Sequence, residues 1–332
     1  MNRNLIVTAG LGIVCAVALT FAPDYLSVGD LRLVSEILLV FTMAQMWNLL
    51  AGYVGLVSLG QQAFIGIGGY AMYAATVRFD ASPYLGMMVA FATSGAIAAV
   101  SAGFLFRLRN AYFSIGTWVF AEIVRIVITK IDWLGGSAGM AFQGLAGFGV
   151  AFSTACFWSA LVLALVSFAI SQGLMRSRVG LALMAVRDNE LAAASCGIDV
   201  VQNRLIAFVL SAALCGAAGS VYFAQALFID TTSAFDVNWV VILLFIVIVG
   251  GIGTNGGPII GTVLYFGVRE LFRNAEGWYL ILMGAIAFGT MMLAPQGIWG
   301  QIIRRYKVSF LTLRRSLPTS STQAKLLTRK LR

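Results

Sequence analysis

The stretch TACFWSALVLALVSFAISQGL at residues 154–174 contains no charged side chain and is long enough to cross a membrane. A helix needs about 20 mostly apolar residues to cross a hydrocarbon layer roughly 30 Å thick. Similar stretches recur along most of the 332 residues, of which 60% are hydrophobic and only 11% are charged. They are too long for the strands of a membrane barrel, and backbone groups in lipid must be hydrogen-bonded within the segment. The sequence therefore predicts an all-α fold, a polytopic transmembrane helical bundle.

The predicted spans number about ten, judged by the length that one crossing requires. They cover residues 5–22, 31–51, 62–77, 84–106, 112–129, 154–174, 204–224, 238–250, 258–272 and 278–294. An even number of crossings leaves both termini on one side, and most of the 22 lysines and arginines lie in the loops and ends of that side. Because basic loops stay in the cytoplasm, we expect both the N-terminus and the C-terminus to be cytoplasmic. Residues 1–300 then form the transmembrane domain, with a cytoplasmic loop at 175–203, and residues 301–332 form a basic cytoplasmic tail.

The tail carries nine basic residues and no acidic residue. We expect a solvated tail that sets the orientation, and the alternative is a tail that binds anionic lipid headgroups at the membrane surface. Few aromatic residues interleave its charges, so we expect no nucleic-acid binding. Histidine is absent and the four cysteines are scattered, which predicts no metal site, no cofactor and no catalytic site.

The longest predicted cytoplasmic loop contains RVGLALMAVRDNELAAASC at residues 178–196. Its residues are mostly strong helix formers, so we expect one short helix that Gly197 ends, followed by a cap at Asp199 for the next span. The consecutive polar residues encircle that helix and leave apolar side chains for contact with a partner. The polar residues are Arg187, Asp188, Asn189 and Glu190, and the apolar ones are Leu181, Met184, Ala185 and Leu191. A plain surface helix is the alternative.

Two glycine-rich segments, at residues 52–70 and 250–261, interrupt the hydrophobic pattern with polar side chains. Paired interrupted segments of this kind point to a substrate path, although close helix packing explains the glycines equally well. The candidate path residues in and beside them are Asn48, Ser58, Gln61, Gln62 and Asn255. Residues 251–256 match GxGxxG formally, but they join two membrane spans and are not expected to bind a nucleotide.

Glu122 and Arg125 lie three residues apart inside a predicted span, so they share a helix face and can pair. Ionisable residues at membrane depth are costly and are functional candidates, so Glu122 joins the candidate path. The alternative is that Arg125 lies near the outer interface and extends its guanidinium toward water. Glu36, Arg269 and Glu270 lie closer to helix ends and rank lower.

Three motifs together resemble the permease subunits of branched-chain amino acid ABC importers, in the branch that supplies the longer of two paired permeases. They are WNLLAGYVGLVSLGQQAFIGIGGY at 47–70, RVGLALMAVRDNELAAASCGI at 178–198 and GGIGTNGGPIIG at 250–261. The resemblance covers residues 44–300. Gly69, where the family commonly has alanine, and the long basic tail depart from it.

The resemblance implies that residues 178–196 form the coupling helix that an ATPase receives, with Arg187, Asp188, Asn189, Glu190 and Gly197 in the contact. It also implies a second related permease, two cytoplasmic ABC ATPases and a periplasmic substrate-binding protein. None of the four lysines lies in a Walker A motif, so any ATP is bound by another chain. The implied function is alternating-access import of branched-chain or other hydrophobic amino acids across the bacterial inner membrane.

Other functions stay open at this stage. Related permeases carry urea, short amides or aromatic acids, and the pore sequence does not separate them. A secondary transporter would use Glu122 or Glu36 to bind a coupling ion and would need no ATPase. A membrane scaffold without transport predicts that charge reversal at Glu190 leaves uptake unchanged.

Overall fold

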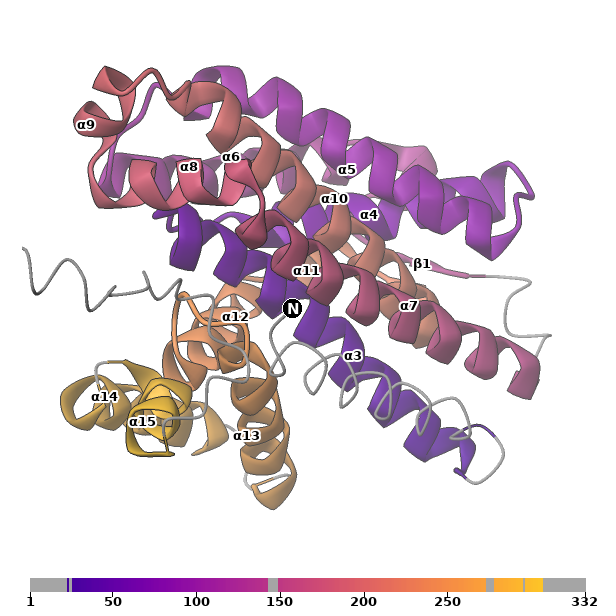
Figure 1. Ribbon diagram of the computed structural model, residues 1–332. Coiled ribbons are helices and arrows are strands. Elements are labelled where there is room, and N and C mark those ends of the chain that lie inside the picture. The colour runs from indigo at the N-terminus through magenta and orange to yellow at the C-terminus, as the bar shows by residue number, and fades with distance from the viewer. Residues whose placement is uncertain (1–22, 24–25, 143–148, 273–277, 295, 307–332) are drawn as a thin grey trace, which may run out of the picture.

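The computed structural model describes residues 23, 26–142, 149–272, 278–294 and 296–306 (Figure 1). The first predicted span, 5–22, and nearly all of the predicted tail lie outside these residues. The described part is almost entirely helical. Its helices of eight or more residues are α3 (Val28–Asn48), α4 (Gln61–Tyr73), α5 (Pro83–Leu105), α6 (Ala111–Thr129), α7 (Gly149–Arg176), α8 (Arg178–Asp188), α10 (Val200–Ala226), α12 (Asn238–Gly250), α13 (Gly257–Leu271), α14 (Trp278–Leu293) and α15 (Gly297–Tyr306).

Shorter elements connect these helices. They are the π-helical segments η1 (Leu49–Val54) and η2 (Ala74–Arg78), the 3₁₀ segment η3 (Asp132–Leu134), the short helices α9 (Glu190–Ser195) and α11 (Thr231–Ala234), and the strands β1 (Met140–Ala141) and β2 (Phe228–Ile229). The helix α15 runs across residue 300, where the sequence predicts the boundary between the membrane domain and the tail.

Among the described residues, seven helical segments are long and apolar enough to cross a membrane. They are Val28–Val54, Pro83–Leu105, Ala111–Thr129, Ala151–Arg176, Val200–Ala226, Thr231–Gly250 and Leu280–Ile302. Each overlaps a predicted span, so the predicted multi-pass helical fold is confirmed. α4 and α13 are shorter, with 13 and 15 residues. The count of ten crossings and the cytoplasmic termini stay predictions.

Local sequence explains where several helices begin. The Ser82 side chain accepts a hydrogen bond from the Leu85 amide, and Pro83 follows at the first helical position of α5. Asp199 Oδ1 accepts a hydrogen bond from the Gln202 amide at 2.9 Å, which confirms the predicted cap of α10.

The helix α10 lies at the centre of the bundle and packs against α3, α4, α5 and α7. Its contact with α4 is close because glycines meet there: a Cβ added to Gly68 would lie 1.9 Å from the Gly216 carbonyl oxygen. α12, α13 and α14 pack on one another and join the bundle through α3 (Figure 1, orange to yellow). Most of the core is therefore one large apolar cluster that includes α10, and a small second cluster joins α3 to α7 at Leu31, Phe157 and Leu161.

The two ends of the bundle carry different elements. α8 and α9 lie at one end, and β1, which pairs antiparallel with β2, lies at the other (Figure 1). The Arg78 guanidinium also ties η2 to η3 at the β1 end by donating to the Trp133 carbonyl at 2.6 Å. We call the α8 and α9 end the inner end and the β1 end the outer end, after the predicted orientation.

The predicted single helix at 178–196 is wrong at Asn189. This residue has an extended backbone (φ −159°, ψ 105°), and its Oδ1 accepts a hydrogen bond from the Ala192 amide at 3.0 Å. An asparagine side chain that caps a following helix competes with helix continuation, so the segment divides into α8 and α9. The predicted stop at Gly197 is confirmed: its φ is +83°, and the Ile198 amide closes the turn on the Ala193 carbonyl.

Candidate functional site

The inner end brings α8 onto the π-helical segment η1. Leu183 and Val186 are fully buried on one side of α8. Arg187, which directly follows Val186, donates from Nη1 to the Gly52 carbonyl oxygen at 2.7 Å. Its Nε and Nη2 also bond Asp188 Oδ1 at 3.1 and 3.0 Å, which orients the guanidinium. The last turn of α8 is therefore joined to a membrane helix by a charge-assisted hydrogen bond.

Gly52 allows a further close contact, with the loop between α12 and α13. A Cβ on Gly52 would lie 2.4 Å from the Gly253 amide nitrogen and 2.5 Å from Asn48 Oδ1. Asn48 accepts a hydrogen bond from the Gly253 amide at 2.8 Å and donates to the Thr254 carbonyl at 2.9 Å. Only glycine fits between these groups, so the loop and η1 are held as one unit.

Asn255 continues this network into the membrane domain. Its Oδ1 accepts hydrogen bonds from Tyr53 at 2.6 Å, from Ser171 at 3.1 Å and, more weakly, from Gln45 at 3.5 Å. These side chains come from η1, α7 and α3 and are fully or almost fully buried. We call the whole network the inner joint: Gln45, Asn48, Gly52, Tyr53, Ser171, Arg187, Gly253, Thr254 and Asn255.

Buried polar atoms without partners also lie in the inner joint. Within the described residues, Asn255 Nδ2 and Gln45 Oε1 have no hydrogen-bond partner. Leaving such an atom unpaired costs about 1–3 kcal/mol. π-helical segments such as η1 often occur at functional sites. The inner joint thus combines the hydrogen bond from Arg187 to Gly52 with buried polar atoms that could find hydrogen-bond partners in another arrangement of the helices.

The remaining polar candidates lie at the start of α4. Gln61 donates to Ser211 Oγ on α10 at 2.9 Å, and Ser211 donates to the Met46 carbonyl at 3.0 Å. The Ser58 carbonyl accepts from the Trp47 indole at 2.8 Å. Gln62 is buried, and its Oε1 has no partner among the described residues. These contacts tie α4 to α3 and α10, close to the inner joint in sequence.

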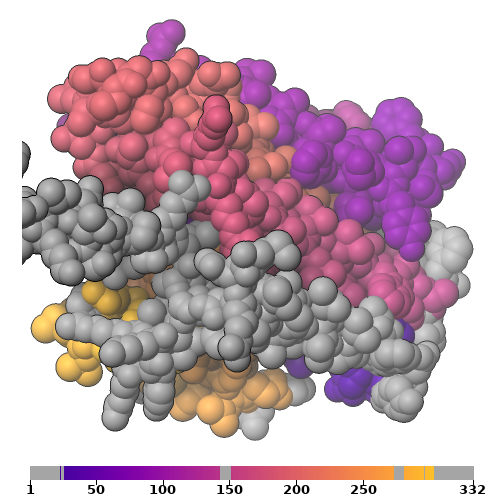
Figure 2. All heavy atoms as spheres, in the orientation of Figure 1, coloured from indigo at the N-terminus to yellow at the C-terminus, as the bar shows by residue number. Residues whose placement is uncertain are grey.

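In contrast with α8, α9 lies mostly at the surface. Leu191 is 81% exposed, and only Ala193 is buried. Glu190 forms a two-pronged ion pair with Arg204, at the start of α10, with distances of 2.9 and 3.1 Å. In Figure 2 the segment that contains α8 and α9 forms part of the visible surface at the upper left. The inner end thus presents a short helix with an apolar side chain open to a partner.

A protein-family model described as "Branched-chain amino acid transport system / permease component" matches residues 31–295. The chain belongs to this permease family.

Individual relatives agree with the family match. The high-affinity branched-chain amino acid transport system permease proteins LivM of Salmonella typhimurium and Escherichia coli are each 28% identical over 308 residues, which cover 83% of this chain and 71% of theirs. The probable branched-chain amino acid transport permease protein LivH of Methanocaldococcus jannaschii is 30% identical over 175 residues, covering 49% of this chain and 52% of that protein. No solved structure matches the chain significantly.

The permease brings some of the predicted site residues together and separates others. Asn48 and Asn255, predicted for the path, meet Arg187, predicted for ATPase coupling, through Gly52 and its neighbours. Glu122 lies elsewhere. It pairs with Arg125, as the spacing predicts, on the exposed side of α6.

Sequence reasoning missed several residues of the site. Gly52 lies within a glycine-rich motif, but its closeness to Gly253 joins segments about 200 residues apart, which no local pattern reveals. Tyr53, Gln45 and Ser171 resembled ordinary residues of apolar helices. The ion pair of Arg269 with Glu36, at 2.6 Å between α13 and α3, was also missed because the two residues come from distant spans.

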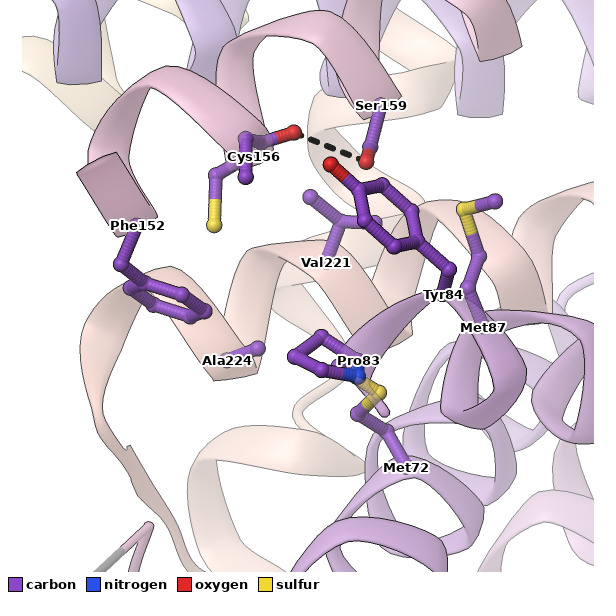
Figure 3. A pocket seen from close by; sticks show the side chains of 10 residues that line it. Met72, Pro83, Tyr84, Met87, Phe152, Cys156, Ser159, Val221 and Ala224 are labelled. Carbon is purple, nitrogen blue, oxygen red and sulfur yellow. Dashed lines mark hydrogen bonds between the residues drawn. The ribbon is translucent and has the colours of Figure 1, made fainter. Parts of the chain in front are cut away.

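A small pocket near the outer end offers a different kind of surface (Figure 3). It lies where α4, α5, α7 and α10 meet, and its lining is almost wholly apolar. Met72, Pro83, Tyr84, Phe152, Cys156 and Val221 line most of it. The Ser159 hydroxyl donates a hydrogen bond to the Ala155 carbonyl of its own helix, α7 (Figure 3). The pocket supplies no charged group for a polar substrate.

Proposed function

We propose that this permease forms, with a second related permease, the membrane path of an ATP-driven importer, and that α8 and α9 are the element that its ATPase moves. The observation that carries the proposal is the hydrogen bond from Arg187 to the Gly52 carbonyl. It connects a surface helix directly to the backbone of a membrane span. The coupling element then includes Arg187, which contacts Gly52, and Asp188, which orients the Arg187 guanidinium. It also includes Asn189, which caps α9, Glu190, which pairs with Arg204, and Gly197, which ends α9.

The mechanism that follows is alternating access. ATP binding closes two cytoplasmic ATPases, which carry α9 with them through its exposed side. α8 is buried against η1 and transmits the displacement to Gly52 and, through Asn48, to the 251–256 loop. The polar atoms of the inner joint that lack partners support this step, because a second arrangement of η1, α7 and the loop would offer them new ones.

The substrate class rests on the relatives. The named relatives are branched-chain amino acid transport permeases, and we infer the same class, branched-chain or other hydrophobic amino acids, for this chain. A periplasmic binding protein would deliver the substrate, and the chain would lie in the bacterial inner membrane with about ten spans and both termini cytoplasmic. The path would run past Asn48, Ser58, Gln61, Gln62, Glu122 and Asn255. Urea, short amides and aromatic acids are the alternative substrates.

One experiment tests the proposal as a whole. The complex is purified in mild detergent from its native membrane, and the copurifying proteins are identified by mass spectrometry. The proposal predicts a second permease and ABC ATPases in fixed ratio with this chain. Uptake into membrane vesicles gives the second measurement. Uptake that persists after ATP depletion, while an ion gradient remains, would contradict the proposal and favour an ion-coupled transporter.

A further inference from the structure

The helix α6 is one of two spans of the described chain that are little covered, the other being Leu280–Ile302. Only 17% of the most apolar window of α6 is buried, against 72% for α10. The uncovered side carries large apolar residues such as Ile115, Trp118 and Ile126. Glu122 and Arg125 lie on this same side, since positions three, four and seven apart share one face of a helix.

The two charges bind each other and sit well inside the span. Arg125 Nε lies 3.0 Å from both carboxylate oxygens of Glu122, and its Nη2 contacts Oε1 as well. Their side chains are still 46% and 36% exposed. Glu122 precedes the end of α6 at Thr129 by about two turns, or roughly 10 Å. The pair therefore lies within the apolar length of α6 with nearly half of its surface uncovered.

An ion pair in this position is not explained by packing. A different ion pair, Arg269 with Glu36, joins α13 to α3 and so holds two helices together. Glu122 and Arg125 belong to one helix, and their bond joins no other element. Charged groups within a membrane face protein or water rather than hydrocarbon, and they commonly mark a substrate path.

We propose that Glu122 and Arg125 bind the α-ammonium and α-carboxylate groups of the transported amino acid. This rests on the proposed function, and it assigns the substrate contact within that path. The ligand carries one charge of each sign on neighbouring atoms. Its carboxylate takes the place of Glu122 on the Arg125 guanidinium, and its ammonium takes the freed Glu122 carboxylate. One ion pair becomes two, no charge is left unpaired, and Ile115, Trp118 and Ile126 offer apolar contacts to the ligand side chain.

Uptake by the reconstituted complex separates this role from a structural one. The complex with its partners is placed in liposomes with ATP, and L-leucine uptake and ATP hydrolysis are measured for Glu122→Gln, Arg125→Gln and the double variant. Each single variant should lose uptake by about tenfold or more, because one charge of the ligand then meets no partner. The double variant should be equally poor. If the pair only neutralised itself, removing both charges would restore uptake, and that result would overturn the proposal.

Labelling provides a readout that does not depend on turnover. Ile126→Cys, next to the pair, and Val100→Cys, on the exposed side of α5, are made in a chain without its native cysteines and treated with a negatively charged thiol reagent. Only the cysteine at 126 should react, and L-leucine should slow the reaction. Leucinamide and 4-methylpentanoate, which each lack one charge, should not. No reaction at 126, or equal protection by all three compounds, would overturn the proposal. If the wild-type complex takes up no amino acid with ATP, the proposed function itself fails.

Discussion

α8 and α9 are neighbours in sequence but differ sharply in what holds them. α8 buries Gly180, Leu183 and Val186 and reaches the Gly52 carbonyl through Arg187. α9 buries only Ala193 and is tied to the bundle by an exposed ion pair between Glu190 and Arg204. The helix break at Asn189 separates the buried α8 from the exposed α9.

The comparison assigns different tasks to the two helices. A helix that must transmit a displacement has to be fixed to the part it moves, and α8 meets that need. A helix that a partner protein binds has to present exposed apolar surface, and α9 does so with Leu191. Changes in the α8 contact should therefore alter the stability and coupling of the permease, whereas changes in α9 should alter partner binding.

The largest expected effect is that of Gly52→Ala. The new Cβ would lie within 2.5 Å of both the Gly253 amide nitrogen and Asn48 Oδ1, which leaves no room without backbone movement. We expect a loss of unfolding free energy of about 3 kcal/mol, seen as a lower thermal unfolding midpoint of the solubilised permease. Gly103→Ala in α5, where no atom lies within 4 Å of the new Cβ, is the matched control. Equal midpoints for the two variants would contradict the close contact.

Asn48→Ala should have the next largest effect on stability. The change removes the partners of the Gly253 amide and the Thr254 carbonyl, for a cost of about 2 kcal/mol. Asn203→Ala removes an exposed hydrogen bond to the Asp199 carbonyl and should shift the midpoint far less. The two variants are compared by thermal unfolding in the same detergent. A larger loss at Asn203 than at Asn48 would show that the inner joint does not hold the 251–256 loop.

Leu191→Asp should leave stability unchanged and weaken partner binding. Leu191 is 81% exposed, so the permease loses no packing of its own, while an ATPase that covers it would meet a charge. We expect recovery of ATPase with the purified permease to fall about tenfold. Leu271→Asp, at an 82% exposed position near the outer end, is the control and should not change recovery. Unchanged recovery of ATPase with Leu191→Asp would argue against α9 as the helix that the ATPase binds.

The smallest effect is expected for Glu190→Gln. The ion pair with Arg204 is partly solvated, with side chains 48% and 20% exposed. Such pairs contribute about 0.2–1 kcal/mol, and salt weakens them. The midpoint should shift little in low salt and not measurably in high salt. A drop comparable to that of Asn48→Ala would mean that α9 is as firmly anchored as α8.

Much of the helical fold was predictable because hydrophobic length and helix capping act locally. The predicted span 238–250 coincides with α12, and the caps at Asp199 and Gly197 lie where the sequence places them. The break at Asn189 was not predicted, because the surrounding helix formers favour one continuous helix and the asparagine cap decides otherwise.

The candidate site was predictable only in pieces. The sequence predicts Arg187 for ATPase coupling and Asn48 and Asn255 for the substrate path, as separate sites. Their connection through Gly52 depends on how α3, α8 and the 251–256 loop meet in space. Gln45, Tyr53 and Ser171 gave no signal, since single polar groups in apolar helices are common. Distant contacts of this kind are not encoded in spacing along the chain.

The central claim, that the Arg187 contact passes motion from the ATPase to the membrane domain, is tested most directly by the amount of amino acid imported per ATP hydrolysed. The ratio is measured in liposomes for Arg187→Ala and for Arg178→Ala, an exposed arginine at the other end of α8. We expect Arg187→Ala to lower the ratio about tenfold while ATP hydrolysis continues, and Arg178→Ala to leave it unchanged. A wild-type ratio in Arg187→Ala would contradict the account.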